Sequence, residues 1–485
     1  MGRSAGAWLA VSAFALTACT DFILLIGKSD QEIAAILGED APNVVVREVP
    51  VGAEADRPLF IKGATIIAMN GTAPDVGSVL IKNDMIEAIG PDLVAPEDAE
   101  VVEAEGLTLL PGLADMHVHH FSKAEGPLYI ANGITTVRSF RSTTPTAGFD
   151  EPAKNQVPAS PRVYTPGPIM DGPEPIWGAG SVVIENAEEA IGAVRAQKAA
   201  GFTAIKIYEK LSEEAFTAAV QEAKAQDMQV YAHTPLSMTV DQVISLEIDS
   251  LEHLNNAQDY LVPDDYPWPE DYNSLRTWAA ADDDKMDALA QMIAEADVWN
   301  AATLEVTIGR YASALEADDF FASEIGSYVG PGLKGWWSES ARRIQTWATP
   351  ELIDDARAKQ LAFLKALYDA NAPLLIGTDT PNPFVVPGFS LHGEIASFSE
   401  AGIPNQAILR IATADAAAFL GEGNNFGKVE EAMRADLILV DGDPLTDLSV
   451  LRNPTAVIAG GEHYDRDELD AMLAEARDHE SGSEE

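Results

Sequence analysis

Two histidines separated by one residue, His117 and His119, stand in the apolar segment 110–119. Side chains of an extended strand alternate between its two faces, so these two imidazoles point the same way. Imidazole nitrogens bind transition metals, and two on one face supply half of a metal site. Two polar residues on a solvated strand are the alternative reading. The apolar surroundings, and the turn that Pro111 and Gly112 place before the strand, favour the metal.

Other candidate ligands stand at the ends of further strand-like segments of the chain. These residues are Lys206, His233, His253 and Asp379. Each has an ordinary alternative: a core histidine, a lysine that extends out to water, or an aspartate that caps a helix. Because the carboxyl ends of barrel strands meet on one face, the recurrence of such residues at strand ends predicts a shared metal site.

Eight strand-like segments, most of them followed by a helical pattern, would have to position these side chains. They are residues 110–119, 133–140, 162–165, 202–208, 228–233, 248–253, 298–306 and 373–379. Asn186 and Ser212 are predicted to cap the helices that follow the third and fourth segments. This alternation predicts an α/β fold with a parallel sheet. Eight units favour a closed (β/α)8 TIM barrel over an open sheet.

Two β-rich patches flank the barrel segment, and chain ends often lie close together in space. We therefore expect a small β-sandwich satellite domain built from both chain ends. The predicted organisation is a composite β-sandwich at 57–110 and 422–465, a barrel at 111–421 with a long insertion at about 256–350, and an acidic tail at 466–485. Six of the eight tryptophans fall in the insertion, which is either a lid over the site or a solvated segment with its own helical core.

The 485 residues carry 31 Lys and Arg against 77 Asp and Glu, a formal net charge of −46. So acidic a surface repels phosphate backbones, and we expect no nucleic-acid partner. The single cysteine excludes an internal disulfide and a zinc site made of cysteines.

That cysteine, Cys19, follows a short apolar run in the sequence Leu-Thr-Ala-Cys, which resembles a bacterial lipobox. Residues 1–19 are predicted to be a lipoprotein signal peptide and residues 20–56 a linker. The protein would then be exported to the bacterial cell envelope, facing the periplasm, and would touch the membrane only through a lipid on Cys19. An ordinary signal peptide with an incidental cysteine is the alternative.

A family resemblance covers the chain from the first β-rich patch to about His463. Its motifs are LPGLADMHVH (110–119), NGITTVR (132–138), AIKIY (204–208), AHTP (232–235), DSLEHL (249–254), GTD (377–379), LHGE (391–394) and ADLILVDGDPL (435–445). With these motifs the chain resembles the amidohydrolase superfamily, and within it the imidazolonepropionase-like and Xaa-Pro dipeptidase-like metal-dependent hydrolases.

The resemblance implies two divalent metal ions, most often zinc. His117, His119 and Asp379 would hold the buried ion, and His233 and His253 the outer one. A protonated lysine is a poor ligand. An N6-carboxylated Lys206 has two carbamate oxygens, and it would bridge both ions.

A hydroxide between the two ions would then attack the carbonyl carbon of an amide, with Asp379 carrying the proton to the leaving nitrogen. Tyr208 lies two residues beyond Lys206 in sequence. It would donate a hydrogen bond to the oxyanion or pack as an aromatic side chain at the strand end. Arg138 would bind a substrate carboxylate or pair with a buried acid.

These features predict a binuclear metal-dependent amidohydrolase that cleaves a C–N amide bond of a small molecule, of the dipeptide or N-acyl amino acid type. Hydrolysis of cyclic amides, lactones or esters on the same site is the first alternative, and a metal-binding lipoprotein without turnover is a remote one. The sequence leaves open whether the chain forms a homo-oligomer.

The lipobox makes a testable prediction about localisation. A Cys19→Ser variant should lose lipid labelling and leave the membrane fraction, because the only thiol that can be lipidated is removed. The catalytic domain should be unharmed. Labelling with a lipid precursor and fractionation of cells check this prediction. Unchanged fractionation would show that the cysteine is incidental.

Overall fold

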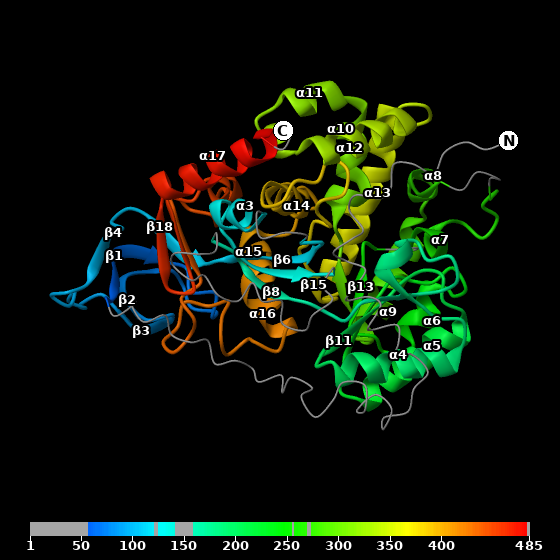
Figure 1. Ribbon diagram of the computed structural model, residues 1–485, viewed down its shortest axis with the longest axis horizontal. Coiled ribbons are helices and arrows are strands. Elements are labelled where there is room, and N and C mark those ends of the chain that lie inside the picture. Colours follow the sequence, from blue (N-terminus) through cyan, green and yellow to red (C-terminus); the bar gives the residue numbers. More distant parts are fainter. Residues whose placement is uncertain (1–56, 121–124, 141–158, 255–256, 269–272, 483–485) are drawn as a thin grey trace. The chain divides into compact units, whose positions relative to one another are not determined.

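The computed structural model describes residues 57–120, 125–140, 159–254, 257–268 and 273–482 (Figure 1). The predicted signal peptide with Cys19 and the predicted linker lie outside these residues. The described chain falls into two compact units. One contains residue 140 and Thr165–Leu251, and the other contains the remaining described residues.

An eight-stranded sheet in the larger unit combines strands from both ends of the chain (Figure 1). Its strands are β1 (Leu59–Ile66), β2 (Asp75–Lys82), β3 (Met85–Gly90), β4 (Glu100–Glu103), β5 (Thr108–Pro111), β16 (Leu437–Val440), β17 (Ala456–Ala459) and β18 (Glu462–Asp465). The order is β18-β17-β16-β5-β1-β2-β3, with β4 beside β1. Leu110 pairs with Ile438, which joins the two ends, and fully buried Ile61 and Leu439 belong to one apolar core. Whether this sheet is a separate sandwich domain stays a prediction.

Two groups of parallel strands in the same unit lead to the candidate site. The first is β6 (Leu113–Val118), β7 (Ile134–Ser139) and β8 (Arg162–Tyr164), and the second is β14 (Trp299–Ala301) and β15 (Leu374–Leu375). Nearly every residue in them is buried, as expected for parallel strands covered on both faces. β14 ends earlier than predicted, because Thr303 adopts a left-handed φ of 49° and a π-helix, η3 (Glu305–Gly309), follows.

The smaller unit has its own parallel strands, in the order β10-β9-β11-β12-β13. They are β9 (Ile169–Asp171), β10 (Ser181–Val183), β11 (Ala204–Ile207), β12 (Gln229–Ala232) and the start of β13 (Ser250–Glu252). The helices α4 (Ala187–Ala199) and α5 (Glu213–Ala225) are packed together. The predicted caps are confirmed: Asn186 accepts from the Glu189 N–H and Ser212 from the Ala215 N–H.

The predicted insertion is largely helical in the described residues. Its helices are α7 (Ala257–Leu261), α8 (Ser274–Ala279), α9 (Asp283–Glu295), α10 (Arg310–Leu315), α11 (Ala317–Ala322) and α12 (Pro331–Ile344). Trp337 on α12 is fully buried and packs on Phe384, with ring centroids 5.7 Å apart. Phe320 on α11 contacts the same ring. Trp337 and Phe320 of the insertion thus pack against the loop that follows Asp379.

The short helices α3 (Gly126–Ala131) and α6 (Val240–Ile244) lie earlier in the chain, and five more lie in its last third. These five are α13 (Pro350–Asp369), α14 (Phe389–Glu400), α15 (Asn405–Arg410), α16 (Ala416–Phe419) and α17 (Arg466–Gly482). The segment predicted as an acidic tail therefore forms helix α17, which is anchored by fully buried Leu469.

The fold class is α/β, and a strand is found within each of the eight predicted segments. The strand pairings among the described residues do not close into a ring, so the closed barrel is not shown. Within the described part of the chain, no helix combines the length and the apolar composition needed to cross a bilayer.

Candidate metal centre

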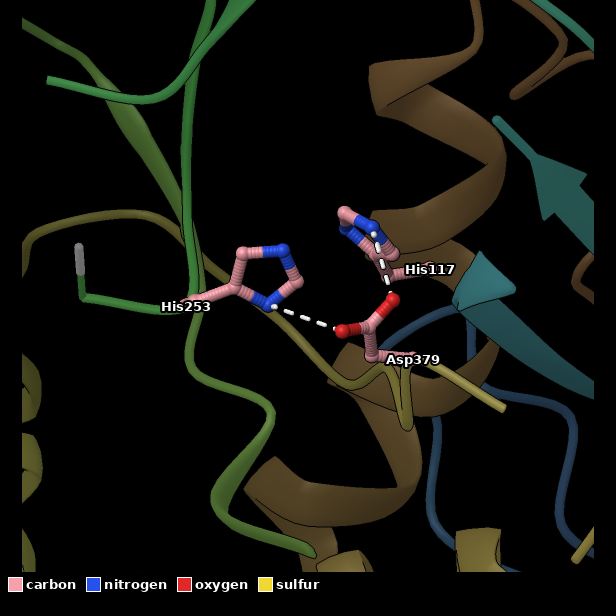
Figure 2. A group of neighbouring side chains, drawn as sticks. All are labelled: His117, His253 and Asp379. Carbon is pink, nitrogen blue, oxygen red and sulfur yellow. Dashed lines mark ion pairs between the residues drawn. The ribbon is translucent and has the colours of Figure 1, made fainter. Parts of the chain in front are cut away.

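Four of the predicted ligands come together in the larger unit, around the carboxylate of Asp379. The Nε2 atoms of His119 and His117 lie 2.8 and 3.4 Å from Oδ1, and His253 Nδ1 lies 3.9 Å from Oδ2. Figure 2 shows the carboxylate between the rings of His117 and His253, with one oxygen directed at each. One ligand atom from each of His117, His253 and Asp379 falls within 4.8 Å of the others. A single ion can therefore be shared by these groups.

The backbone on either side of Asp379 is tied to the strand that carries the histidines. The Asp379 N–H donates to the His117 carbonyl at 2.6 Å, and the His119 N–H donates to the Thr380 carbonyl at 2.7 Å. Asp379 itself has a left-handed φ of 64°. Such a conformation costs free energy in a residue other than glycine and often occurs at functional sites. Here it ends the strand-like path and presents the carboxylate to the imidazoles.

Asp115, two residues before His117, is a second buried carboxyl group, and it aligns the two segments. It accepts from the Thr378 hydroxyl at 2.7 Å and from the Thr378 N–H at 3.0 Å. Burial raises the pKa of Asp115 to about 7, against the opposing effect of these hydrogen bonds. The period of two places Asp115, His117 and His119 on one face of the strand. Asp115 could have been proposed from that spacing, although the sequence analysis did not name it.

The orientation of His117 is set by Glu252, which is fully buried. His117 Nδ1 and Glu252 Oε2 are 2.6 Å apart. A metal-binding histidine commonly bonds a carboxylate through its other ring nitrogen, which fixes the tautomer and the ring orientation. This contact leaves Nε2 of His117 directed at Asp379 and available as the ligand atom.

Arg138 pairs with a buried acid, Glu252. Its Nη2 donates to both carboxylate oxygens of Glu252, at 2.9 and 3.0 Å, and its Nε donates to the Met116 carbonyl at 2.6 Å. The side chain is fully buried. The structure therefore shows one of the two roles considered for Arg138, pairing with a buried acid. Binding of a substrate carboxylate by Arg138 stays a prediction.

His253 is positioned from the next strand along the chain. Its N–H donates to the Ala301 carbonyl at 2.7 Å, and its Nδ1 lies 2.8 Å from the hydroxyl of Thr303. Both His253 and Thr303 have left-handed φ values, 65° and 49°. The structure therefore brings His253 to His117 and Asp379, the residues that the sequence analysis assigned to the buried ion, whereas it had assigned His253 to the outer ion.

The donor set fits a transition metal. Three imidazoles and one carboxylate are the ligand types that zinc and related divalent ions prefer. All four side chains are largely shielded from water, with His119 and Asp379 about 8% exposed. The imidazole nitrogens of three histidines lie close to the Asp379 carboxylate. This is the arrangement expected when the histidines and the carboxylate bind one cation.

The smaller unit holds the predicted residues Lys206, Tyr208 and His233. Lys206 is buried within β11, and its Nζ lies 4.4 Å from the centre of the Phe140 ring. A lysine buried in an apolar strand loses the hydration that stabilises its ammonium form. Burial therefore favours the neutral amine, which is the nucleophilic form of the side chain.

His233 follows β12 and is also buried. Its Nδ1 lies 3.0 Å from Glu209 Oε1, an arrangement similar to that of His117 and Glu252. The Tyr208 ring packs on its imidazole, with centroids 4.0 Å apart. The aromatic packing considered for Tyr208 is therefore present, and its role toward an oxyanion stays a prediction.

Three residues at these sites were not predicted from the sequence: Glu252, Glu209 and Thr303, which contact His117, His233 and His253. Glu252 had a detectable signal, since an acid inside an apolar strand requires a buried cation or donor. Nothing in the local sequence links Thr303 to His253, because that contact depends on a turn 50 residues later.

Comparisons with known proteins identify the family of the chain. A sequence model of the Amidohydrolase family matches residues 108–463, more than half of the chain. Dihydroorotases of Geotalea daltonii and Geobacter sulfurreducens are 43% and 44% identical to it over 61 residues. Each match spans 13% of this chain and 14% of the dihydroorotase.

Solved structures show a similar fold over most of the chain. A bottromycin amidohydrolase has a TM-score of 0.69 at 22% identity, covering 96% of both chains. A Xaa-Pro dipeptidase with bound methionine has a TM-score of 0.59 at 20% identity, covering 84% of this chain and all of that one. At these identities the likeness shows the fold alone.

The Arg138–Glu252 pair makes a prediction about stability. Glu252→Gln should destabilise the protein by about 3–5 kcal/mol, because the guanidinium is left buried without a counter-charge. It should also weaken metal binding by about 10- to 100-fold, because His117 loses its carboxylate. Denaturant unfolding and metal titration measure the two effects.

The matched control is Glu103→Gln, which removes one partner of the exposed Lys62–Glu103 ion pair. That change should cost no more than about 1 kcal/mol. Equal losses of stability in the two variants would contradict the role assigned to Glu252.

Proposed function

The chain belongs to the amidohydrolase family, and from this premise we propose that it is a hydrolase acting on carbon–nitrogen bonds. Its proposed substrate is the amide bond of a dipeptide or an N-acyl amino acid, cleaved with the help of bound divalent metal. The observation that carries the proposal is the arrangement of His117, His119 and His253 around the carboxylate of Asp379.

His117, His119, His253 and Asp379 would hold the ion, with zinc the metal that best suits these donors. A bound divalent ion polarises the substrate carbonyl and lowers the pKa of a water molecule, which supplies a nucleophile near neutral pH. Glu252 holds the ring of His117 in position through Nδ1. Thr303 does the same for His253.

Asp379 is the proposed general base and general acid. Its carboxylate would accept a proton from the attacking water at one oxygen and then deliver that proton to the leaving nitrogen. The left-handed backbone at Asp379 and the hydrogen bond from its N–H to His117 hold this group in place. The Tyr208 hydroxyl is the proposed donor to the oxyanion.

A second ion is a further part of the proposal, with His233 and Lys206 among its ligands. CO2 adds to the neutral amine of Lys206, an N–C bond forms and a proton is lost, which gives a carbamate with two oxygens. The burial of Lys206 in β11 and the Glu209 contact of His233, both within the smaller unit, support these assignments.

The wider setting is proposed from the sequence. We propose a (β/α)8 barrel with a β-sandwich satellite domain, exported and attached to the cell envelope by a lipid on Cys19. The substrate is a small molecule, and the net charge of −46 argues against nucleic acid. Association of the chain with further copies is compatible with this proposal.

A substrate panel tests the proposed function. The purified, zinc-loaded protein is offered dipeptides, N-acyl amino acids, cyclic amides, lactones and simple esters at equal concentration. We expect the highest kcat/KM on the first two classes and loss of the rate with a chelator. Asp379→Asn should lower kcat by about 10²- to 10⁴-fold, and the exposed control Asp92→Asn should not. A preference for cyclic amides or lactones would replace the proposed substrate class, and no turnover on any class would overturn the proposal.

The carbamate makes a prediction that separates it from a positively charged lysine. Lys206→Ala should lose activity and most of the second ion, and a short carboxylic acid should partly restore both. Lys206→Arg keeps the charge but offers no acceptor oxygen, so it should stay inactive. Lys206→Glu should retain a trace of activity.

Metal content and rate of the three variants, with and without added acid and bicarbonate, check this prediction. If Lys206→Arg kept both ions and a substantial rate, the carbamate would be wrong, and Lys206 would act as an ammonium.

A further inference from the structure

A buried acid on helix α14, Glu394, takes no part in the chemistry proposed above. Its side chain is fully buried, and one of its oxygens, Oε1, has no hydrogen-bond partner among the described residues. Burying an acid in this way is costly. Its retention in the core therefore calls for a specific interaction.

The other carboxyl oxygen of Glu394 reaches the turn that follows β14. Oε2 accepts from the Glu305 N–H at 2.9 Å, and the N–H of Leu304 also donates to the carboxyl group. These two N–H groups belong to the peptide planes that follow Thr303. Holding the first of those planes fixes the ψ angle of Thr303, and holding the second fixes the start of η3.

Thr303 needs such support because of its backbone. It is fully buried and has a φ of 49°, which is unfavourable for a side chain branched at Cβ. In this conformation its hydroxyl lies 2.8 Å from Nδ1 of His253. If Thr303 relaxed to an ordinary conformation, the hydroxyl would move away from the imidazole.

We propose that Glu394 is a positioning residue, which holds Thr303 in its left-handed conformation and thereby orients the His253 imidazole. The link runs from α14 to Leu304 and Glu305, from there to Thr303, and finally to His253. The inference rests on the proposed function only in that it takes His253 to be a metal ligand.

The surroundings of Glu394 support a role based on hydrogen bonding. Burial raises the pKa of Glu394 to about 8 and that of Glu305 to about 7, so Glu394 is largely neutral near pH 7 and Glu305 is partly so. Gly393 leaves room for the Glu305 carboxyl group, since a Cβ there would lie 2.5 Å from its Oε1. A neutral acceptor that cannot move is what the two N–H groups require.

Because Glu394 acts as a neutral acceptor, its role is tested by two uncharged variants that differ in whether they keep the acceptor oxygen. Glu394→Gln keeps an acceptor oxygen of similar reach, whereas Glu394→Leu keeps the volume and removes the acceptor. Thr303→Val removes the hydroxyl and keeps the branched shape. Ser397→Ala is the control on the same helix, because Ser397 is also buried and its hydroxyl accepts from Arg357 Nη2 and not from the N–H groups of Leu304 and Glu305.

The first measurement is zinc affinity, by competition with a chelating dye. Glu394→Leu and Thr303→Val should each weaken binding by about 10- to 100-fold, while Glu394→Gln and Ser397→Ala stay within about threefold of the wild type. In the double variant the losses should not multiply, because both changes break one link. Losses that multiply would overturn the inference, as would a lower melting temperature of Glu394→Leu with unchanged zinc affinity.

The second measurement uses metal-free protein with 15N-labelled histidine and needs neither zinc nor turnover. Glu394→Leu and Thr303→Val should shift the same imidazole signal, which His253→Gln identifies, and Ser397→Ala should leave it in place. An unmoved signal in Glu394→Leu would overturn the inference. Failure of the proposed function would appear separately: the wild-type protein would bind no zinc, while the Glu394→Leu and Thr303→Val variants would still show these shifts.

Discussion

The carboxylate of Asp379 lies buried among three imidazoles, and this arrangement places the strongest constraint on the structure. A buried carboxylate needs a positive charge or several hydrogen-bond donors nearby. Imidazoles supply that charge only when they are protonated or when they share a cation with the acid. Glu252, by contrast, already has a permanent counter-charge in Arg138. A divalent ion among His117, His119, His253 and Asp379 would satisfy all four groups at once.

Three residues next to the site have an unfavourable backbone conformation. His253, Thr303 and Asp379 all adopt left-handed φ values next to the site, although none of them is glycine. Each such residue costs about 1–3 kcal/mol, which the surrounding hydrogen bonds must offset. Asp115 joins β6 to Thr378, and Glu394 holds the turn after Thr303. The part of the site described here is therefore held by buried polar groups as well as by apolar packing.

The sequence predicted much of this arrangement, because strand ends, helix caps and alternating side chains are local features. The strands and the caps at Asn186 and Ser212 follow from such patterns, and so does the approach of His117, His119 and Asp379. The pairing of Arg138 with Glu252 could not be derived, since it joins residues 114 positions apart in the chain. The left-handed turn at Thr303 was also missed, because it depends on contacts with α14. Closure of the barrel requires knowledge of how all the strands pair, which local patterns do not supply.

The central claim is that His117, His119, His253 and Asp379 bind a metal ion. A crystal structure of the zinc-loaded protein, with anomalous data collected on both sides of the zinc edge, tests it most directly. We expect a zinc peak within about 2.0–2.2 Å of Nε2 of His117 and an oxygen of Asp379. Zinc only at surface sites, with the imidazoles still in direct contact with the Asp379 carboxylate, would contradict the claim.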